Sequence, residues 1–252
     1  MKPTRVPRIL LVEDDSVSRA FLAAAVEALP AQVEAAADCA QARQLASQLP
    51  GHDLWLIDAN LPDGSGTDLL VALRAAAPHT PALAHTASQQ RADLDPLLAA
   101  GFLEVLVKPI TADALQGAIR RVLGGGVALA DIATDPVPVP CGKLPNWDDP
   151  AALAALKGER AHVDALRRLF LDELPAQRHA IVAALAAGDV ERAGRELHRL
   201  HASCGFVGAA RLGAAVQALQ QAPASPLLLS AFEEAAQDTL SQASAIQFPF
   251  SD

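Results

Sequence analysis

Residues 8–20 read RILLVEDDSVSRA, a short apolar run that ends in three acids and leads into a segment of helical composition. An apolar run of this length that stops abruptly is typical of a buried strand. The same order of strand and helix recurs downstream. Strands are expected at residues 8–12, 32–36, 53–57, 82–85 and 105–107, and helices at residues 16–29, 38–49, 67–77, 89–100 and 111–123. This alternation predicts an α/β domain, a doubly wound parallel sheet with helices on both faces.

The pattern changes after residue 123. Residues 124–145, GGGVALADIATDPVPVPCGKLP, contain glycines and then prolines at near-alternate positions, which indicates a linker. Beyond the linker the chain is rich in alanine and leucine, and short connections between helices predict an antiparallel all-α bundle. Helices are expected at residues 150–156, 160–185, 190–204, 211–221 and 227–245, with Gly205 and Gly208 interrupting the third. The predicted parts are therefore residues 1–123, 124–145 and 146–252.

Composition narrows the class of protein. The formal net charge of -9 would repel a phosphate backbone, which argues against a nucleic-acid partner. No segment is apolar for long enough to cross a bilayer, so no membrane insertion is expected. The three cysteines, Cys39, Cys141 and Cys204, have neither disulfide-framework nor zinc-site spacing, which favours a reducing, cytoplasmic compartment.

Acidic side chains follow two of the expected strands. Glu13, Asp14 and Asp15 come directly after the first strand, and Asp58 follows the third. If these strands are neighbours, the carboxylates converge at one edge of the sheet, where they ionise together only around a cation. Oxygen ligands that leave room for water and a phosphate suit Mg²⁺.

The next two strands end in a hydroxyl and an ammonium group, at Thr86 and Lys108. A nucleophilic carboxylate, a metal, a hydroxyl and a lysine are the groups needed to hold a phosphoryl group and stabilise its transfer. Each feature alone is most often structural. Together, at successive strand ends, they indicate a phosphoryl-accepting site.

The first part resembles the response-regulator receiver family over about residues 6–123, through the motifs ILLVEDDSVSR, LIDANLPDGSG, HTAS and VLVKP. The resemblance implies a flavodoxin-like fold with sheet order 2-1-3-4-5. It implies that Asp58 is the phosphoacceptor and that Asn60 lends its backbone carbonyl to Mg²⁺. Glu13 and Asp14 match the family's acid pair, with Asp14 as the direct metal ligand.

The same resemblance implies that Thr86 is the switch hydroxyl and Lys108 the phosphate-binding lysine. It also makes the bond before Pro109 a candidate for the cis form. One departure is Val105, which stands where the family usually has an aromatic switch residue. This departure puts the aromatic readout of phosphorylation in question, but not the chemistry. A folded but inert pseudo-receiver is the competing interpretation.

The second part carries a polar stripe on the expected helix 190–204, VERAGRELHRLHASC. Arg195, His198 and His201 are three residues apart and therefore share a helix face, with Arg199 close by. An imidazole flanked by cations and small residues suits a phosphohistidine, although a histidine on a helix is usually only a surface residue. A wider basic cluster is expected to steer an acidic receiver toward His198; it comprises Arg160, Arg167, Arg168, Arg192, Arg195 and Arg199.

The stretch FLDELPAQRHAIVAALAAGDVERAGRELHRLHASCGFVGAARLG is similar to the histidine-phosphotransfer (HPt) family. The resemblance implies that His198 is the phosphorylated residue. Two positions depart from the family pattern: the usual lysine is His201, and the usual glycine is Ala202. A histidine is only partly charged at neutral pH, so transfer is expected to be weaker or pH-dependent. The added methyl of Ala202 is expected where a partner loop approaches.

The leading hypothesis is a phosphorelay signalling protein rather than a turnover enzyme. In this hypothesis Asp58 accepts a phosphoryl group from a sensor histidine kinase. The phosphoryl group is then exchanged between receiver aspartates and His198, and the partners are other receiver or HPt domains. An alternative makes the helical part a docking domain that carries no phosphate. A third hypothesis, a DNA-binding output domain, is disfavoured by the acidic charge and by the absence of a base-reading pattern.

Overall fold

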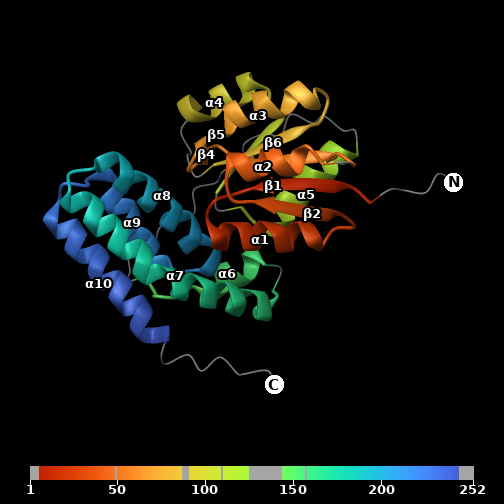
Figure 1. Ribbon diagram of the computed structural model, residues 1–252. Helices are drawn as coiled ribbons and strands as arrows, with labels where there is room; N and C mark the ends of the chain where they lie inside the picture. The colour runs from red at the N-terminus through yellow and green to blue at the C-terminus, as the bar shows by residue number, and fades with distance from the viewer. Residues whose placement is uncertain are drawn as a thin grey trace. The chain divides into compact units, whose positions relative to one another are not determined.

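The computed structural model of the chain describes residues 6–48, 50–86, 91–108, 110–124, 144–156 and 158–243 (Figure 1). The chain divides into two compact units, residues 1–137 and 138–252. Most of the predicted linker and the predicted cis bond at Pro109 lie outside the described residues.

Five parallel strands form the sheet of the first unit. In chain order they are β1 (Arg8–Val12), β2 (Gln32–Ala36), β3 (Leu54–Asp58), β6 (Ala82–Thr86) and β7 (Glu104–Val107). The order within the sheet is β2-β1-β3-β6-β7, which confirms the predicted order 2-1-3-4-5. All residues of the central strand β3 are buried, because helices cover both faces of the sheet.

The five helices of this unit are α1 (Ser16–Glu27), α2 (Cys39–Ala46), α3 (Gly66–Ala76), α4 (Arg91–Ala100) and α5 (Ala112–Leu123). Helices α1 and α5 pack against each other on one face of the sheet, and α2, α3 and α4 cover the other (Figure 1). Alternate strand residues face the second group: Leu10, Trp55 and Ile57 share one buried apolar cluster with Leu69 and Leu70 of α3. This alternation follows from the two-residue period of a strand.

The helices begin where polar side chains cap them. Asp15 Oδ1 accepts a hydrogen bond from the Ser18 backbone N–H at 2.8 Å, so the third acid after β1 is the N-cap of α1. Ser65 Oγ caps α3 by accepting from the Asp68 N–H at 3.1 Å. Asp63 accepts from the backbone N–H groups of Cys39 and Ala40 at 2.8 and 3.0 Å, which ties the loop after β3 to the start of α2.

The structure differs from the predicted boundaries in several places. Strand β3 ends at Asp58 rather than at Ile57, because the backbone of Ala59 still pairs with the His85 carbonyl at 3.0 Å. Helix α1 ends two residues before the predicted limit, Leu29. A small hairpin of β4 (Asn60–Leu61) and β5 (Gly64–Ser65), which the sequence pattern did not predict, follows β3 directly.

The second unit is all-helical, as predicted. Its helices are α6 (Asp149–Ala155), α7 (Arg160–Ala186), α8 (Val190–Val207), α9 (Ala210–Gln221) and α10 (Pro226–Ala243). Helix α7 packs against α8 and α10, and α9 packs against α8 and α10, so these four close into a bundle (Figure 1). Short connections make successive helices antiparallel. Among the described residues, no helix combines the length and the apolar character that a membrane crossing needs.

Helix α8 continues through Gly205 and ends at Gly208, so the prediction that Gly205 interrupts it is wrong. Gly208 has a φ of +71°, a left-handed conformation that side chains disfavour. A Cβ at this position would lie 2.4 Å from the Asp148 carbonyl oxygen. Gly208 therefore lets the end of α8 pack directly against the start of α6.

Gly208→Ala is expected to lower the free energy of unfolding by about 2 kcal/mol or more, because the methyl meets backbone and the left-handed φ is strained. Chemical denaturation of the full chain measures this loss. The matched control is Gly194→Ala in the same helix, where nothing lies within 4 Å of the added Cβ. That variant is expected to be stabilised by about 1 kcal/mol. Equal effects of the two variants would contradict this role for Gly208.

Arg167 does not belong to a solvated basic face, and its inclusion in the predicted cluster is wrong. Its side chain is 2% exposed and donates to the Val207 carbonyl at 2.9 Å and to Asp149 Oδ1 at 2.6 Å. The guanidinium also lies 4.7 Å from the centre of the Trp147 ring. Arg167 therefore holds α6, α7 and the end of α8 together inside the bundle.

Candidate functional site

The first candidate site lies at the carboxyl ends of four strands. Glu13 follows β1, Asp58 ends β3, Thr86 ends β6 and Lys108 follows β7, and all four are buried. Lys108 Nζ donates hydrogen bonds of 2.6 Å to Glu13 Oε2 and to Asp58 Oδ2. The parallel order of the sheet therefore brings together three of the predicted residues from distant parts of the sequence.

Two buried carboxylates, of Glu13 and Asp58, share one buried ammonium group, of Lys108, at this edge of the sheet. Burial alone lowers the pKa of Lys108, but the neighbouring Glu13 and Asp58 carboxylates outweigh burial and raise it. Burial alone raises the pKa of Asp58, but the Lys108 charge and the Asn60 N–H hold it below its ordinary value. Burial and the Asp58 charge raise the pKa of Glu13 well above its ordinary value. One ammonium thus does not fully compensate two buried carboxylates, and the site favours an additional cation.

The loop after β3 fixes the Asp58 carboxylate. The Asn60 backbone N–H donates to Asp58 Oδ1 at 2.9 Å, which leaves Oδ2 for Lys108. Gly66 passes so close that a Cβ there would lie 2.3 Å from the Asp58 carbonyl oxygen. The β4–β5 hairpin and Gly66 therefore hold the loop tightly against the end of β3.

Among the described residues, one group of three side chains has the spacing of a metal site: Glu13, Asp58 and His85. A ligand atom from each lies within 4.8 Å of the other two. Asp14, the predicted direct metal ligand, is half-buried on the loop after β1 and is not a member of this group. The buried carboxylates and the raised pKa of Glu13 fit a divalent cation at this edge.

His85 is a residue of this site that the sequence analysis missed. Its ring is fully buried, with Nδ1 3.3 Å from Glu13 Oε2 and 3.7 Å from Asp58 Oδ2. Burial, and next the Lys108 charge, lower the pKa of His85 to about 3, so the imidazole is neutral at neutral pH. The available signal was a histidine inside the otherwise apolar strand ALAHT, one residue before the predicted Thr86.

The second candidate site lies on α8. His198, His201 and Arg199 are half-buried and Arg195 is exposed. Arg195 pairs with Glu191 at 2.5 Å and Arg199 with Glu196 at 3.4 Å, both within the helix. Each arginine is therefore paired with a glutamate of the same helix, so the positive charge expected around His198 is partly neutralised.

The two departures from the HPt pattern differ in their surroundings. Burial lowers the pKa of His201, so this residue does not supply the charge of the lysine that it replaces. Ala202 is only 4% exposed. Its methyl group is buried in the bundle, so it does not lie on the surface that a partner loop was expected to approach.

His201→Gln is expected to make stability less sensitive to acid. In the unfolded chain His201 titrates near its ordinary pKa of 6.5, whereas burial lowers the pKa in the folded chain. Below about pH 6.5 the unfolded chain therefore binds a proton that the folded chain does not, and wild-type stability falls with pH.

Chemical denaturation between about pH 8 and pH 5 tests this expectation. The free energy of unfolding of His201→Gln should rise relative to wild type as the pH falls. His179→Gln, at an exposed position of α7, is the control and should show no such gain. A difference between His201→Gln and wild type that is constant with pH would contradict the account.

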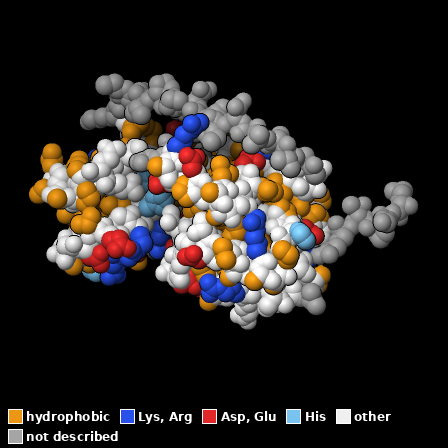
Figure 2. Space-filling model, turned by 90° about the horizontal axis from the view of Figure 1, so that it is seen from above, with side chains coloured by type: hydrophobic (Ala, Val, Ile, Leu, Met, Phe, Trp, Pro, Cys, Tyr) orange, Lys and Arg blue, Asp and Glu red, His pale blue; other side chains and the backbone are white. Residues whose placement is uncertain are grey.

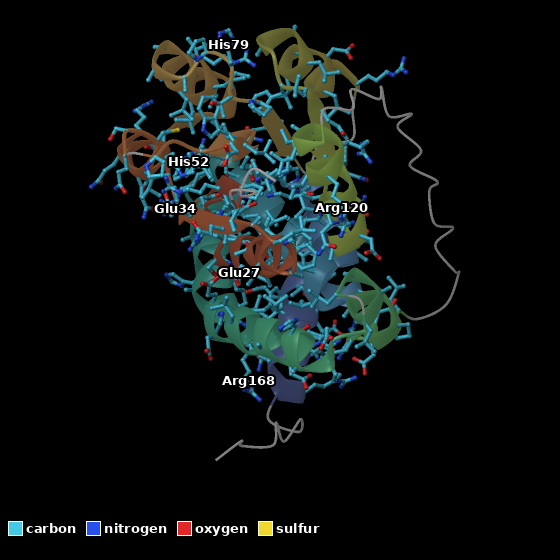
Figure 3. The ribbon with its side chains drawn as sticks, turned by 90° about the vertical axis from the view of Figure 1, so that its right-hand side faces the viewer. Glu27, Glu34, His52, His79, Arg120 and Arg168 are labelled. Carbon is cyan, nitrogen blue, oxygen red and sulfur yellow. The ribbon has the colours of Figure 1, made fainter. Side chains whose placement is uncertain are left out.

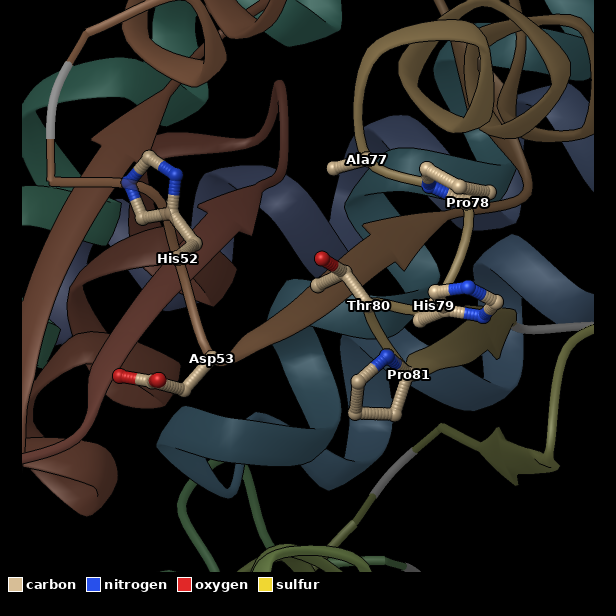
Figure 4. Close-up of a pocket in the computed structure, with 7 residues that line it drawn as sticks. All are labelled: His52, Asp53, Ala77, Pro78, His79, Thr80 and Pro81. Atoms are coloured by element: carbon tan, nitrogen blue, oxygen red, sulfur yellow. The ribbon is translucent and has the colours of Figure 1, made fainter.

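A pocket of about 400 Å³ lies at the opposite edge of the sheet, at the amino ends of β3 and β6 (Figure 4). His52 on its rim makes a bond of 2.9 Å from Nε2 to Glu34 Oε2, and the two side chains lie next to each other in Figure 3. The predicted site residues are not among its lining. The lining consists of His52, Asp53, Ala77, Pro78, His79, Thr80 and Pro81.

Comparison with known families agrees with the two-unit architecture. The model of the response regulator receiver domain matches residues 9–120, and the model of the Hpt domain matches residues 165–246. The first match spans the sheet with its helices, and the second spans α8 and its neighbours in the bundle.

Several curated relatives match more than four fifths of this chain, across both units. The signal transduction histidine-protein kinase BarA of Shigella flexneri is 27% identical over 217 residues, which are 84% of this chain and 23% of that protein. The sensor histidine kinase GacS of Pseudomonas protegens is 29% identical over 228 residues, 85% of this chain and 24% of that protein. The sensor histidine kinase AruS of Pseudomonas aeruginosa is 31% identical over 229 residues, which are 84% of this chain and 20% of that protein.

The chain thus spans about a quarter or less of the length of these relatives. Their similarity runs across both units, in the order in which the two family models match. The chain therefore consists of a response regulator receiver domain followed by an Hpt domain, the domain pair of two-component phosphorelay proteins.

Proposed function

We propose that this chain accepts a phosphoryl group on Asp58 and exchanges phosphoryl between receiver aspartates and His198. The observation that carries the proposal is the Lys108 ammonium, 2.6 Å from Asp58 Oδ2 at a buried strand end, in one chain with an Hpt domain. We assign the receiver to residues 1–123, the linker to 124–145 and the Hpt domain to 146–252.

Asp58 is the nucleophile in this proposal. Its carboxylate is kept ionised by Lys108 and by the Asn60 N–H, so one oxygen can attack the phosphorus of a donor phosphohistidine in line. The new P–O bond forms as the P–N bond breaks, and the departing imidazole takes up a proton. Lys108 then moves its ammonium onto the phosphoryl oxygens, and the Thr86 hydroxyl at the end of β6 donates to them.

Mg²⁺ is the cation that we assign to this edge, held by the carboxylates of Asp14 and Asp58 and by the Asn60 carbonyl, with Glu13 in support. When bound, it neutralises charge on the phosphoryl group. The excess of buried negative charge around Glu13 and Asp58 supports this assignment. Asp14 directly follows Glu13 on the loop after β1 and is half-buried.

His198 is a passive acceptor and donor, so we do not assign turnover catalysis to the Hpt domain. A receiver aspartyl phosphate gives its phosphoryl to a ring nitrogen of His198, and the carboxylate is the leaving group. Arg195 and Arg199 offset the added charge, although each is already paired with a glutamate. Transfer is therefore expected to depend more on docking than on local charge.

We infer that the partners are a sensor histidine kinase and further receiver or Hpt domains, and that the chain acts in the cytoplasm. The curated relatives are histidine kinases. Cys39 and Cys204 are buried thiols that are not joined in a disulfide, which agrees with a reducing compartment. A DNA-binding role gains no support from the formal net charge of -9. On the face shown in Figure 2, basic and acidic side chains are interspersed.

Intact-protein mass spectrometry at neutral pH tests the proposal. The full chain is incubated with Mg²⁺, ATP and a sensor kinase of the type that it resembles. Singly and doubly phosphorylated species should both accumulate. If no chain carries more than one phosphoryl group with any donor, the docking alternative is favoured over the relay.

A further inference from the structure

His85 is a fully buried polar side chain at the end of the otherwise apolar strand β6. Its exposed fraction is 0%, and neither ring nitrogen makes a hydrogen bond of acceptable geometry within the described part of the chain. Burying an imidazole in this way costs stability, whereas an aliphatic residue at the same strand position would not. A ligand bound by the imidazole would offset this cost.

The ring is aimed at the two buried carboxylates. Nδ1 lies 3.3 Å from Glu13 Oε2 and 3.7 Å from Asp58 Oδ2. The three side chains come from three adjacent strands, and Asp58 and His85 are paired directly across β3 and β6. An imidazole nitrogen at this position can offer a lone pair to a metal ion.

We propose that Glu13, Asp58 and His85 form a binding site for a divalent transition ion of the Zn²⁺ class. Two carboxylate oxygens and one imidazole nitrogen form a donor set that Zn²⁺ uses, with a fourth position left for water. Mg²⁺ prefers oxygen ligands in an octahedron, so His85 adds little to its binding. The imidazole thus gives this edge of the sheet a preference for Zn²⁺ over Mg²⁺ that carboxylates alone would not give.

The bound ion competes with Lys108. Lys108 Nζ bonds the same two oxygens, Glu13 Oε2 and Asp58 Oδ2, at 2.6 Å each. A divalent ion on these oxygens repels the ammonium and displaces it. The ion would therefore block phosphorylation of Asp58, a consequence that rests on the proposed function, whereas ion binding itself does not.

Titration calorimetry with Zn²⁺ and visible absorption with Co²⁺, on the full chain without a phosphodonor, test the site directly. Wild type should bind one ion tightly. His85→Val and His85→Leu should each weaken Zn²⁺ binding about 100-fold or more, because one of three protein ligands is lost. The same variants should change Mg²⁺ affinity by less than about threefold. Both replacements are apolar and suit a buried strand, and circular dichroism melts verify that each is folded.

Other histidines provide the controls. His198→Gln/His201→Gln removes the pair on α8, and His52→Gln removes the buried histidine that is bonded to Glu34. Neither should affect the tight site. Lys108→Met should strengthen Zn²⁺ binding about tenfold, because the competing ammonium is gone. The proposal is overturned if tight binding survives loss of His85 or disappears with the α8 pair. Unchanged Zn²⁺ affinity in Lys108→Met would overturn the displacement.

A labelling assay with a small phosphodonor separates the two proposals. Zn²⁺ should suppress labelling of Asp58 in wild type, and this suppression should be at least about tenfold weaker in His85→Val. Equal suppression in both proteins would overturn the regulatory consequence. If no labelling occurs under any condition, the proposed receiver function fails, while the calorimetric result still decides the metal site.

Discussion

Asp58→Asn is expected to reduce Mg²⁺-dependent phosphorylation of the receiver by about 1,000-fold or more. The asparagine has almost the shape of the aspartate but lacks the nucleophilic carboxylate that Lys108 and the Asn60 N–H keep ionised. The fold should survive, because Lys108 keeps its hydrogen bond to Glu13. The measurement is the initial rate of labelling by a small phosphodonor, counted as label that is lost in base.

The matched control for this prediction is Asp63→Asn. Asp63 is an exposed acid in the loop after β3 and binds backbone N–H groups at the start of α2. Its replacement should leave the labelling rate within about twofold of wild type. Labelling that persists in Asp58→Asn, or that falls equally in both variants, would show that another group accepts the phosphoryl.

The second large effect is expected for His198→Gln. Glutamine retains a polar side chain on the same face of α8 but cannot form a phosphohistidine, so phosphoryl transfer from a phosphorylated receiver to the Hpt domain should fall about 1,000-fold or more. The measurement is the rate at which base-stable label appears on the chain. The helix itself should be unaffected, because His198 is half-buried at its surface.

Two other histidines make this test specific. His201→Gln changes the neighbour three residues on, whose burial keeps it uncharged, and should retain base-stable label. His179→Gln changes an exposed histidine on α7 and should behave as wild type. Base-stable label that is lost in His201→Gln but kept in His198→Gln would move the phosphorylated position to His201.

The alternation of strand and helix patterns was sufficient to predict a parallel sheet, and the resemblance to receiver domains implied its strand order. The apolar run RILLV is the strand Arg8–Val12, because a short apolar run bounded by polar residues has few other ways to be buried. Helix limits were less predictable. Ala28 and Leu29 favour a helix, but the chain leaves α1 before them to reach β2.

The sequence pattern did not predict which residues surround a single side chain in the folded protein. His85 stands out only when β6 lies beside β3 and its ring meets carboxylates from two other strands. A single histidine in a strand does not change the hydrophobic pattern in a way that would indicate such neighbours. Arg167 was assigned to a charged surface, although Val163, Phe170 and Leu174 mark the same side of α7 as buried. Its spacing from these residues was the available signal.

The most direct test of the account counts base-stable and acid-stable label separately on wild type, Asp58→Asn and His198→Gln. The full chains are incubated with Mg²⁺ and a labelled donor, first a small phosphodonor and then a labelled receiver. Aspartyl phosphate is lost in base, whereas phosphohistidine is lost in acid. Both kinds of label are expected on wild type, base-stable label alone on Asp58→Asn and acid-stable label alone on His198→Gln. Acid-stable label alone on wild type, with every donor, would contradict the relay and leave a receiver joined to a helical docking domain.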